Sequence, residues 1–155
     1  MGNLGCGCPG SMAKVIERPA NEETNTTKAV SELRQWPVQL HLVPPTAPYF
    51  KNAEILVCAD CVAFAMGSMH QELLKGKALA IACPKLDQTD SYVEKLATIF
   101  ATNETPAVTV AIMEVPCCRG LDVMVKQAIE KSGRDIPLET IIVGIDGTRS
   151  LSDLA

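Results

Sequence analysis

The sequence predicts a three-layer α/β domain built on a mostly parallel sheet of four or five strands. Short segments rich in Val and Ile are apolar at both alternating positions, as expected for strands that are covered on both faces. Amphipathic segments of helical spacing lie between them, and this alternation indicates right-handed crossovers in a parallel sheet. The 155 residues, with 47% hydrophobic and 21% charged side chains, suit one globular domain.

The expected elements follow one another along the chain. The strands are expected at residues 38–43, 54–59, 78–82, 108–115 and 140–145. The helices are expected at residues 62–75, 91–102 and 121–131. Gly76 and Gly133 stand where helix C-terminal glycines belong, and Ser31 suggests a short capped turn that ends before Pro37.

The domain organisation is expected to have three parts. Residues 1–30 read as a Cys/Gly-rich head followed by a polar linker. Residues 31–147 read as a single α/β domain, and residues 148–155 read as a frayed tail.

Composition argues against two classes of partner. Lys and Arg number 14 against 18 Asp and Glu, a formal net charge of -4 without a basic cluster, so we expect no nucleic acid. The first ten residues lack the basic and apolar regions of a secretory signal, and the apolar runs are too short or too interrupted to span a bilayer. We therefore expect a cytoplasmic protein without a membrane partner.

The cysteine content is the one anomaly of the composition. The chain has seven cysteines and only two histidines, His41 and His70, both of which we interpret as structural. An odd number of cysteines without an export signal argues against a framework of disulfides and favours metal binding or thiol chemistry.

Most of the cysteines follow expected strands. Three expected strands are followed at their carboxyl ends by cysteines. Cys61 follows residues 54–59, Cys83 follows residues 78–82, and Cys117 and Cys118 follow residues 108–115. Because functional groups gather beyond the carboxyl ends of parallel strands, we expect these thiols at one edge of the sheet. Cys6 and Cys8 belong to the Gly-rich head, which could supply further ligands there.

Thiolates in this number favour an iron–sulfur cluster as the cofactor. Such clusters bind thiolates almost exclusively, and a proline follows both Cys8 and Cys83 as it often does at their ligands. Zinc is the alternative, although it usually takes paired Cys-x-x-Cys motifs and this chain offers only Cys58 and Cys61. Cys58 lies inside an expected strand, so we predict a buried and inert thiol there.

Several longer segments resemble a known family. The strings are CPGS at Cys8, LRQWPVQL at Leu33, ADC at Ala59, ACPKLD at Ala82 and MEVPCC at Met113. They are similar to small ferredoxin-like, 4Fe-4S cluster-binding proteins of anaerobic bacteria and archaea, in which a ferredoxin module is often fused ahead of this domain. The resemblance implies cluster binding and electron transfer with a redox partner protein. This chain lacks the C-x-x-C-x-x-C-x-x-x-C-P run of that module, so the six cysteines carried over are its own: Cys6, Cys8, Cys61, Cys83, Cys117 and Cys118.

Three other functions stay open at this point. A cluster-dependent enzyme could use the charged residues near the cysteines, namely Asp60, Lys85, Asp87, Glu114 and Arg119. A zinc-binding module would use the same thiols. A thiol–disulfide protein would form a reversible bond between Cys58 and Cys61.

Overall fold

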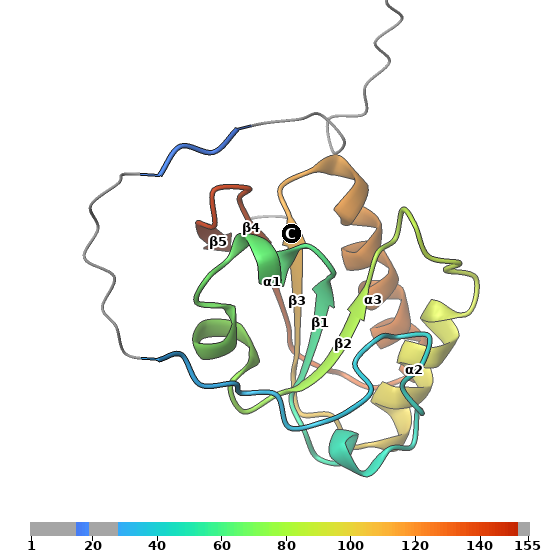
Figure 1. Cartoon of the computed structure of the whole chain (residues 1–155). Helices are drawn as coiled ribbons and strands as arrows, with labels where there is room; N and C mark the ends of the chain where they lie inside the picture. The colour runs from blue at the N-terminus through green and yellow to red at the C-terminus, as the bar shows by residue number, and fades with distance from the viewer. Residues whose placement is uncertain (1–14, 19–27, 152–155) are drawn as a thin grey trace, which may run out of the picture.

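A five-stranded sheet forms the centre of the computed structural model, which describes residues 15–18 and 28–151 (Figure 1). The strand order is β2-β1-β3-β4-β5. The strands are β1 (Ile55–Ala59), β2 (Ala78–Ala82), β3 (Val108–Met113), β4 (Leu138–Val143) and β5 (Arg149–Leu151). Strands β1 to β4 pair in parallel, and β5 pairs antiparallel with β4.

Burial of the strands follows from their apolar sequences. Every residue of β1 and β3, the two central strands with parallel partners on both sides, is buried. In β4 buried residues such as Ile141 alternate with more exposed ones, as expected closer to a sheet edge. The predicted α/β class with a mostly parallel sheet is confirmed.

Helices cover both faces of the sheet. The α-helices are α1 (Val62–Ala65), α2 (Tyr92–Thr102) and α3 (Arg119–Ser132). Two 3-10 turns, η2 (Pro48–Phe50) and η4 (Pro116–Cys118), and one π-helical turn, η3 (His70–Leu74), complete the helical segments of the described residues. Figure 1 shows α2 and α3 side by side on one side of the sheet and α1 with the following turn on the other. The chain moves outward from β1 to β2 and then crosses back to β3, so right-handed crossovers put α1 and α2 on opposite faces.

The helix expected at residues 62–75 is broken in two. Met66 is extended (φ -105°, ψ 101°) and ends α1, and the chain becomes helical again only at η3. Gly67 follows the break and has low helix propensity. Gly147 also lies against the Ala65 carbonyl, at the point where another turn of α1 would begin.

The first expected strand, at residues 38–43, forms only a single parallel bridge between Gln39 and Ile81. The chain then turns, because the N–H groups of Leu42 and Val43 both donate to the Gln39 carbonyl (2.8 and 3.0 Å). Residues 31–35 have no helical turn either; they run along the edge of β2 without regular structure.

The Gln35 side chain completes the edge of β2. Its amide donates to the Leu79 carbonyl and its carbonyl oxygen accepts from the Leu79 N–H, both at 2.7 Å. We expect Gln35→Ala to lower the free energy of unfolding by about 2 kcal/mol, because it leaves two backbone groups of a strand unpaired. Gln71→Ala is the control, since the Gln71 amide makes only long contacts of 3.3 and 3.4 Å at the surface. Urea unfolding that gives equal losses for both variants would contradict this role.

The tail expected at residues 148–155 is ordered in part, which corrects the predicted boundary at residue 147. Arg149–Leu151 form β5 and pair with β4 after a tight turn in which the Gly147 N–H donates to the Gly144 carbonyl (2.9 Å). All three residues of β5 are exposed, so the strand is held by backbone pairing and has no buried apolar face to mark it in the sequence. Residues 1–14 and 19–27, the greater part of the expected head and linker, lie outside the described residues.

Candidate functional site

The carboxyl ends of β1 and β3 form the topological switch point of the sheet. The connection after β1 leads to one face through α1, and the connection after β3 leads to the other through α3. Ligands of open α/β sheets bind in the crevice at this position. Three cysteines follow β1 and β3 here, and a fourth follows the neighbouring strand β2; we call these four the cysteine cluster: Cys61, Cys83, Cys117 and Cys118.

Cys61 begins α1 and is exposed. Its carbonyl accepts from the N–H groups of Phe64 (3.2 Å) and Ala65 (3.1 Å), which fixes its backbone at the mouth of the switch point. The preceding residue, Asp60, donates its N–H to the Ala82 carbonyl (3.1 Å). The ends of β1 and β2 are therefore tied together directly before their cysteines.

Cys83 lies in a loop that Asp87 closes. Asp87 Oδ2 accepts from the Cys83 N–H (2.9 Å), from the Tyr92 hydroxyl (2.5 Å) and from Gln39 Nε2 (3.1 Å). The Asp87 N–H in turn donates to the Cys83 carbonyl (2.9 Å). Burial alone would raise the pKa of Asp87, but the hydrogen bonds from Tyr92 and Cys83 together bring that pKa below its usual value.

The hydroxyl of Tyr92 is the buried anchor of this loop, because Tyr92 is fully buried. Tyr92→Phe should lower the free energy of unfolding by about 2 kcal/mol, the usual contribution of a hydrogen bond to a charged group. Tyr49→Phe is a matched control, since the Tyr49 hydroxyl is buried and has no hydrogen-bond partner among the described residues. It should cost nothing measurable by thermal or urea denaturation. A loss at Tyr49 as large as that at Tyr92 would refute the anchoring role.

Cys117 and Cys118 lie in the turn η4 (Pro116–Cys118), directly before α3. The Cys118 N–H donates to the Val115 carbonyl (3.2 Å), and its side chain is buried. A Cβ on Gly120 would lie 3.4 Å from Cβ of Pro84, so the start of α3 touches the loop of Cys83. The connections after β2 and β3 therefore contact each other, although β1 lies between these two strands in the sheet.

The four thiols interact electrostatically. Burial first, and then the charges of Cys83, Asp60 and Cys117, raise the pKa of Cys61. Burial, supplemented by the charges of Cys117 and Cys61, raises the pKa of Cys118 to about 11. Ionised thiolates at these positions would repel one another, and a bound cation would remove that repulsion.

The donor chemistry fits a thiolate-bound metal centre, but the donors are not preassembled. Within residues 15–18 and 28–151, no three His, Cys, Asp or Glu side chains are arranged to hold a metal ion. Binding would have to draw the thiols together. The remaining predicted ligands, Cys6 and Cys8, lie outside the described residues.

Cys58 does not belong to this cluster. It lies within β1, is 1% exposed, and its thiol contacts the Ala59 carbonyl (3.5 Å). Burial raises its pKa to about 12, with smaller contributions from Asp60 and Cys118. The predicted buried thiol is confirmed, and such a thiol is poorly suited to disulfide exchange with Cys61 because the thiolate is the reactive form.

The five charged residues considered for catalysis have different environments. Asp87 is occupied by the loop of Cys83, whereas Lys85, Glu114 and Arg119 are exposed. Asp60 is the exception. Its Oδ1 is buried without a hydrogen-bond partner among the described residues, and burial followed by the charge of Asp87 raises its pKa.

A cavity of about 360 Å³ opens beside Cys61, and we call it the Cys61 cavity. Its walls come from the end of β3, from α1, from the loop after β4 and from residues 15–18, and the lining residues are Ile16, Arg18, Cys61, Phe64, Ala65, Met113 and Ile145. The cavity is mostly apolar and has one thiol and one guanidinium in its lining.

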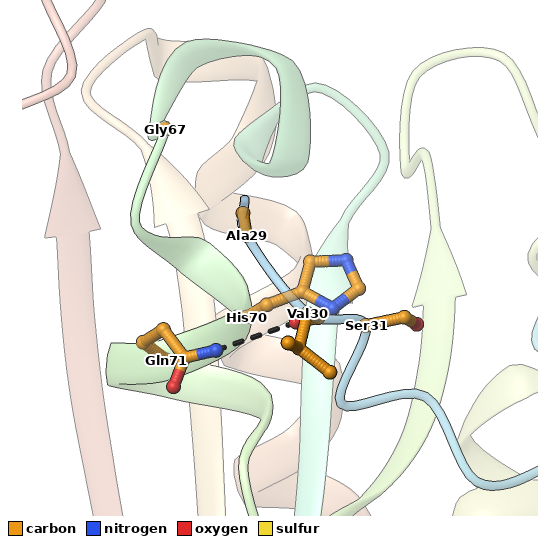
Figure 2. Close-up of a pocket in the computed structure, with 6 residues that line it drawn as sticks. All are labelled: Ala29, Val30, Ser31, Gly67, His70 and Gln71. Carbon is orange, nitrogen blue, oxygen red and sulfur yellow. Dashed lines mark hydrogen bonds between the residues drawn. The ribbon is translucent and has the colours of Figure 1, made fainter. Parts of the chain in front are cut away.

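A second cavity, of about 350 Å³, lies away from the cysteines (Figure 2). It forms where residues 29–31 cross η3, and Gln71 Nε2 donates to the Val30 carbonyl (3.3 Å). His70 Nδ1 accepts from the Glu32 N–H (3.0 Å), so this histidine holds the incoming chain, as expected of a structural residue. His41, expected inside a strand, instead lies in a turn and packs against the Tyr92 ring at 4.7 Å.

Comparison with known proteins supports this fold. A family model described as a Rossmann-like domain matches residues 47–153. The chain belongs to this Rossmann-like domain family. A protein of Archaeoglobus fulgidus, described as uncharacterized, is 34% identical over 118 residues, which cover 76% of this chain and 83% of that protein. No solved structure matches the chain.

This member of the Rossmann-like family has no glycine-rich phosphate loop after β1. A dinucleotide site needs closely spaced glycines between the first strand and its helix, whereas this chain has Asp60 and Cys61 there and no glycine before Gly67. The switch point therefore has thiols at the position where dinucleotide-binding Rossmann domains hold a pyrophosphate. None of the helices in the described part of the chain has both the length and the apolar character needed to cross a bilayer.

Proposed function

We propose that the chain binds an iron–sulfur cluster at the cysteine cluster and uses it to transfer electrons or to sense redox state. The observation that supports this proposal is the placement of four cysteines, in the connections after β1, β2 and β3, along the carboxyl edge of the sheet. Thiols in this number suit iron–sulfur ligation, for which thiolates are the usual ligands.

Each cysteine has a proposed role. The cluster is bound by Cys61, Cys83 and one or both of Cys117 and Cys118, which belong to the connections after three different strands. A further ligand comes from Cys6 or Cys8 of the head. A bound cluster supplies one-electron chemistry. The residues around it hold the ligands in place, since Asp87 fixes the backbone of Cys83 through its N–H.

The chain also offers groups that would balance the charge of such a centre. Lys85 and Arg119 are exposed and lie within two residues of Cys83 and Cys118. Their positive charges would offset the negative charge of bound thiolates, at the strength that screening by water allows. Because Cys61 is exposed, electrons could enter at this edge from a redox partner protein, in the reducing cytoplasm where free thiols persist.

Anaerobic reconstitution with iron and sulfide tests the proposal. The full-length chain should turn brown, with a charge-transfer absorbance that bleaches on reduction, and should retain iron and acid-labile sulfide after gel filtration. A colourless chain without iron would refute it. Zinc retained in place of iron, without sulfide, would instead identify the zinc-binding module.

A cluster-dependent enzyme is the second candidate, and Asp60 is the observation that favours it. A carboxyl group with a raised pKa beside Cys61 could move a proton at a substrate bound to the centre. Asp60→Asn should then leave bound iron unchanged and abolish turnover of such a substrate. An iron centre whose ligands are all cysteine sulfurs would favour electron transfer over this alternative.

A further inference from the structure

The Cys61 cavity is bordered by an exposed aromatic ring. Phe64 of α1 lines the cavity, yet 94% of its surface is exposed. Burying such a side chain is worth about 2 kcal/mol, so an apolar segment that covers it would gain stability. The ring and the cavity lie directly beside the thiol of Cys61.

The chain itself leads into this cavity. Ile16 and Arg18 line it, although they are more than forty residues from the other lining residues. Asp146, next to the lining residue Ile145, has its pKa lowered chiefly by hydrogen bonds from Thr148 and further by the charge of Arg18. Two residues of this segment, Ile16 and Arg18, thus lie at the same cavity as Cys61.

The length of chain before this segment is sufficient to reach the cysteine cluster. Fourteen residues precede Val15, and Cys8 is seven residues before it. Seven residues span at most about 24 Å when extended. Met12 and Ala13, the apolar residues nearest Val15 on that side, match the apolar lining of the cavity.

We propose that residues 6–14 dock in the Cys61 cavity and against Phe64, and that this docking brings Cys8 beside Cys61. The role of this docking rests on the proposed function, because docking would bring Cys8 to the cluster as a further ligand. The docking itself requires only the cavity and the ring, and it is expected in the metal-free chain.

Disulfide trapping tests the docking without metal. The background is the full chain with Cys6→Ser, Cys83→Ser and Cys117→Ser, which keeps Cys8, Cys61 and the two buried thiols. With a chelator present, diamide takes two electrons from the two thiols as the Cys8–Cys61 disulfide forms, and peptide mapping by mass spectrometry measures its rate.

Phe64→Glu provides the comparison, because a flexible tether alone would also produce some Cys8–Cys61 disulfide. Docking predicts that Phe64→Glu slows trapping on the order of tenfold, as expected for the loss of a buried aromatic contact. Leu42→Glu is the matched control; Leu42 is an exposed apolar residue that does not line the cavity, and trapping should keep the rate of the parent.

Two results would overturn the docking. One is a trapping rate that Phe64→Glu leaves unchanged, and the other is a bond from Cys61 to Cys118 or to a second chain in preference to Cys8. Either result leaves iron binding by the unmodified chain to be judged separately, from its iron and sulfide content. Conversely, trapping that depends on Phe64 in a chain that binds no iron would support the docking and refute the proposed cofactor.

Discussion

Replacing Cys61 or Cys83 by serine is expected to reduce the iron bound per chain roughly tenfold after anaerobic reconstitution. The reason is that each thiol comes from a different connection at the carboxyl edge of the sheet, so its loss opens one side of the proposed centre. Removal of even an outer partner of a metal ligand costs about 10- to 100-fold in affinity, and a ligand itself should matter at least as much. Iron and sulfide per folded chain, measured with circular dichroism as a check on folding, give the result.

Cys58→Ala is the matched control for these variants. Its thiol is buried in β1 and contacts only its own strand's carbonyl among polar groups, so its loss should leave the iron content unchanged. Single serine variants at Cys117 and Cys118 then show which of the two adjacent thiols binds iron. Equal iron in the Cys61→Ser, Cys83→Ser and Cys58→Ala proteins would show that the cysteine cluster is not the site.

Gly147→Ala should lower the free energy of unfolding by about 3 kcal/mol. Gly147 has φ of +93°, and a Cβ added there would lie 2.5 Å from the Ala65 carbonyl oxygen. The left-handed backbone costs about 1–2 kcal/mol for a residue with a side chain, and a clash with fixed backbone costs about as much again. Urea denaturation measures the loss, and a change below about 1 kcal/mol would contradict the close approach.

Gly133→Ala separates the two contributions. Gly133 ends α3 with φ of +70°, and nothing lies within 4 Å of a Cβ added there. It should therefore show only the backbone cost of about 1 kcal/mol. The excess at Gly147 measures how tightly the loop after β4, which also carries Ile145 of the Cys61 cavity, is pressed against α1.

The sequence predicts this fold well where burial determines structure. Strand β2 matches the expected residues 78–82, and α2 matches residues 91–102 to within one residue. The reason is that a strand covered on both faces is apolar throughout, whereas a helix that packs on one side is apolar along one stripe. The run at residues 38–43 has a similar pattern, but Lys95 Nζ donates to the carbonyls of Leu40 (2.8 Å) and His41 (2.9 Å) and stabilises a turn there. That contact joins residues more than fifty positions apart, and no local pattern reports it.

The candidate site divides in the same way. The cysteines after β1, β2 and β3 could be found from the sequence, because each follows an apolar strand and parallel strands share one carboxyl edge. The supports of the site could not. Gln39 reaches Asp87 across 48 residues, and Ile16 joins the Cys61 cavity from a distant segment. The exposure of Phe64 could not be predicted either, because its position on an amphipathic segment does not tell whether its ring faces the core or the solvent.

An anomalous scattering map at the iron absorption edge, from crystals of the chain reconstituted under anaerobic conditions, would locate the bound iron directly. We expect iron at the carboxyl edge of the sheet, bonded to the sulfur atoms of Cys61 and Cys83 and to at least one of Cys117 and Cys118. Iron bonded elsewhere, or four separate thiols with no iron between them in a chain that retained iron in solution, would contradict this expectation.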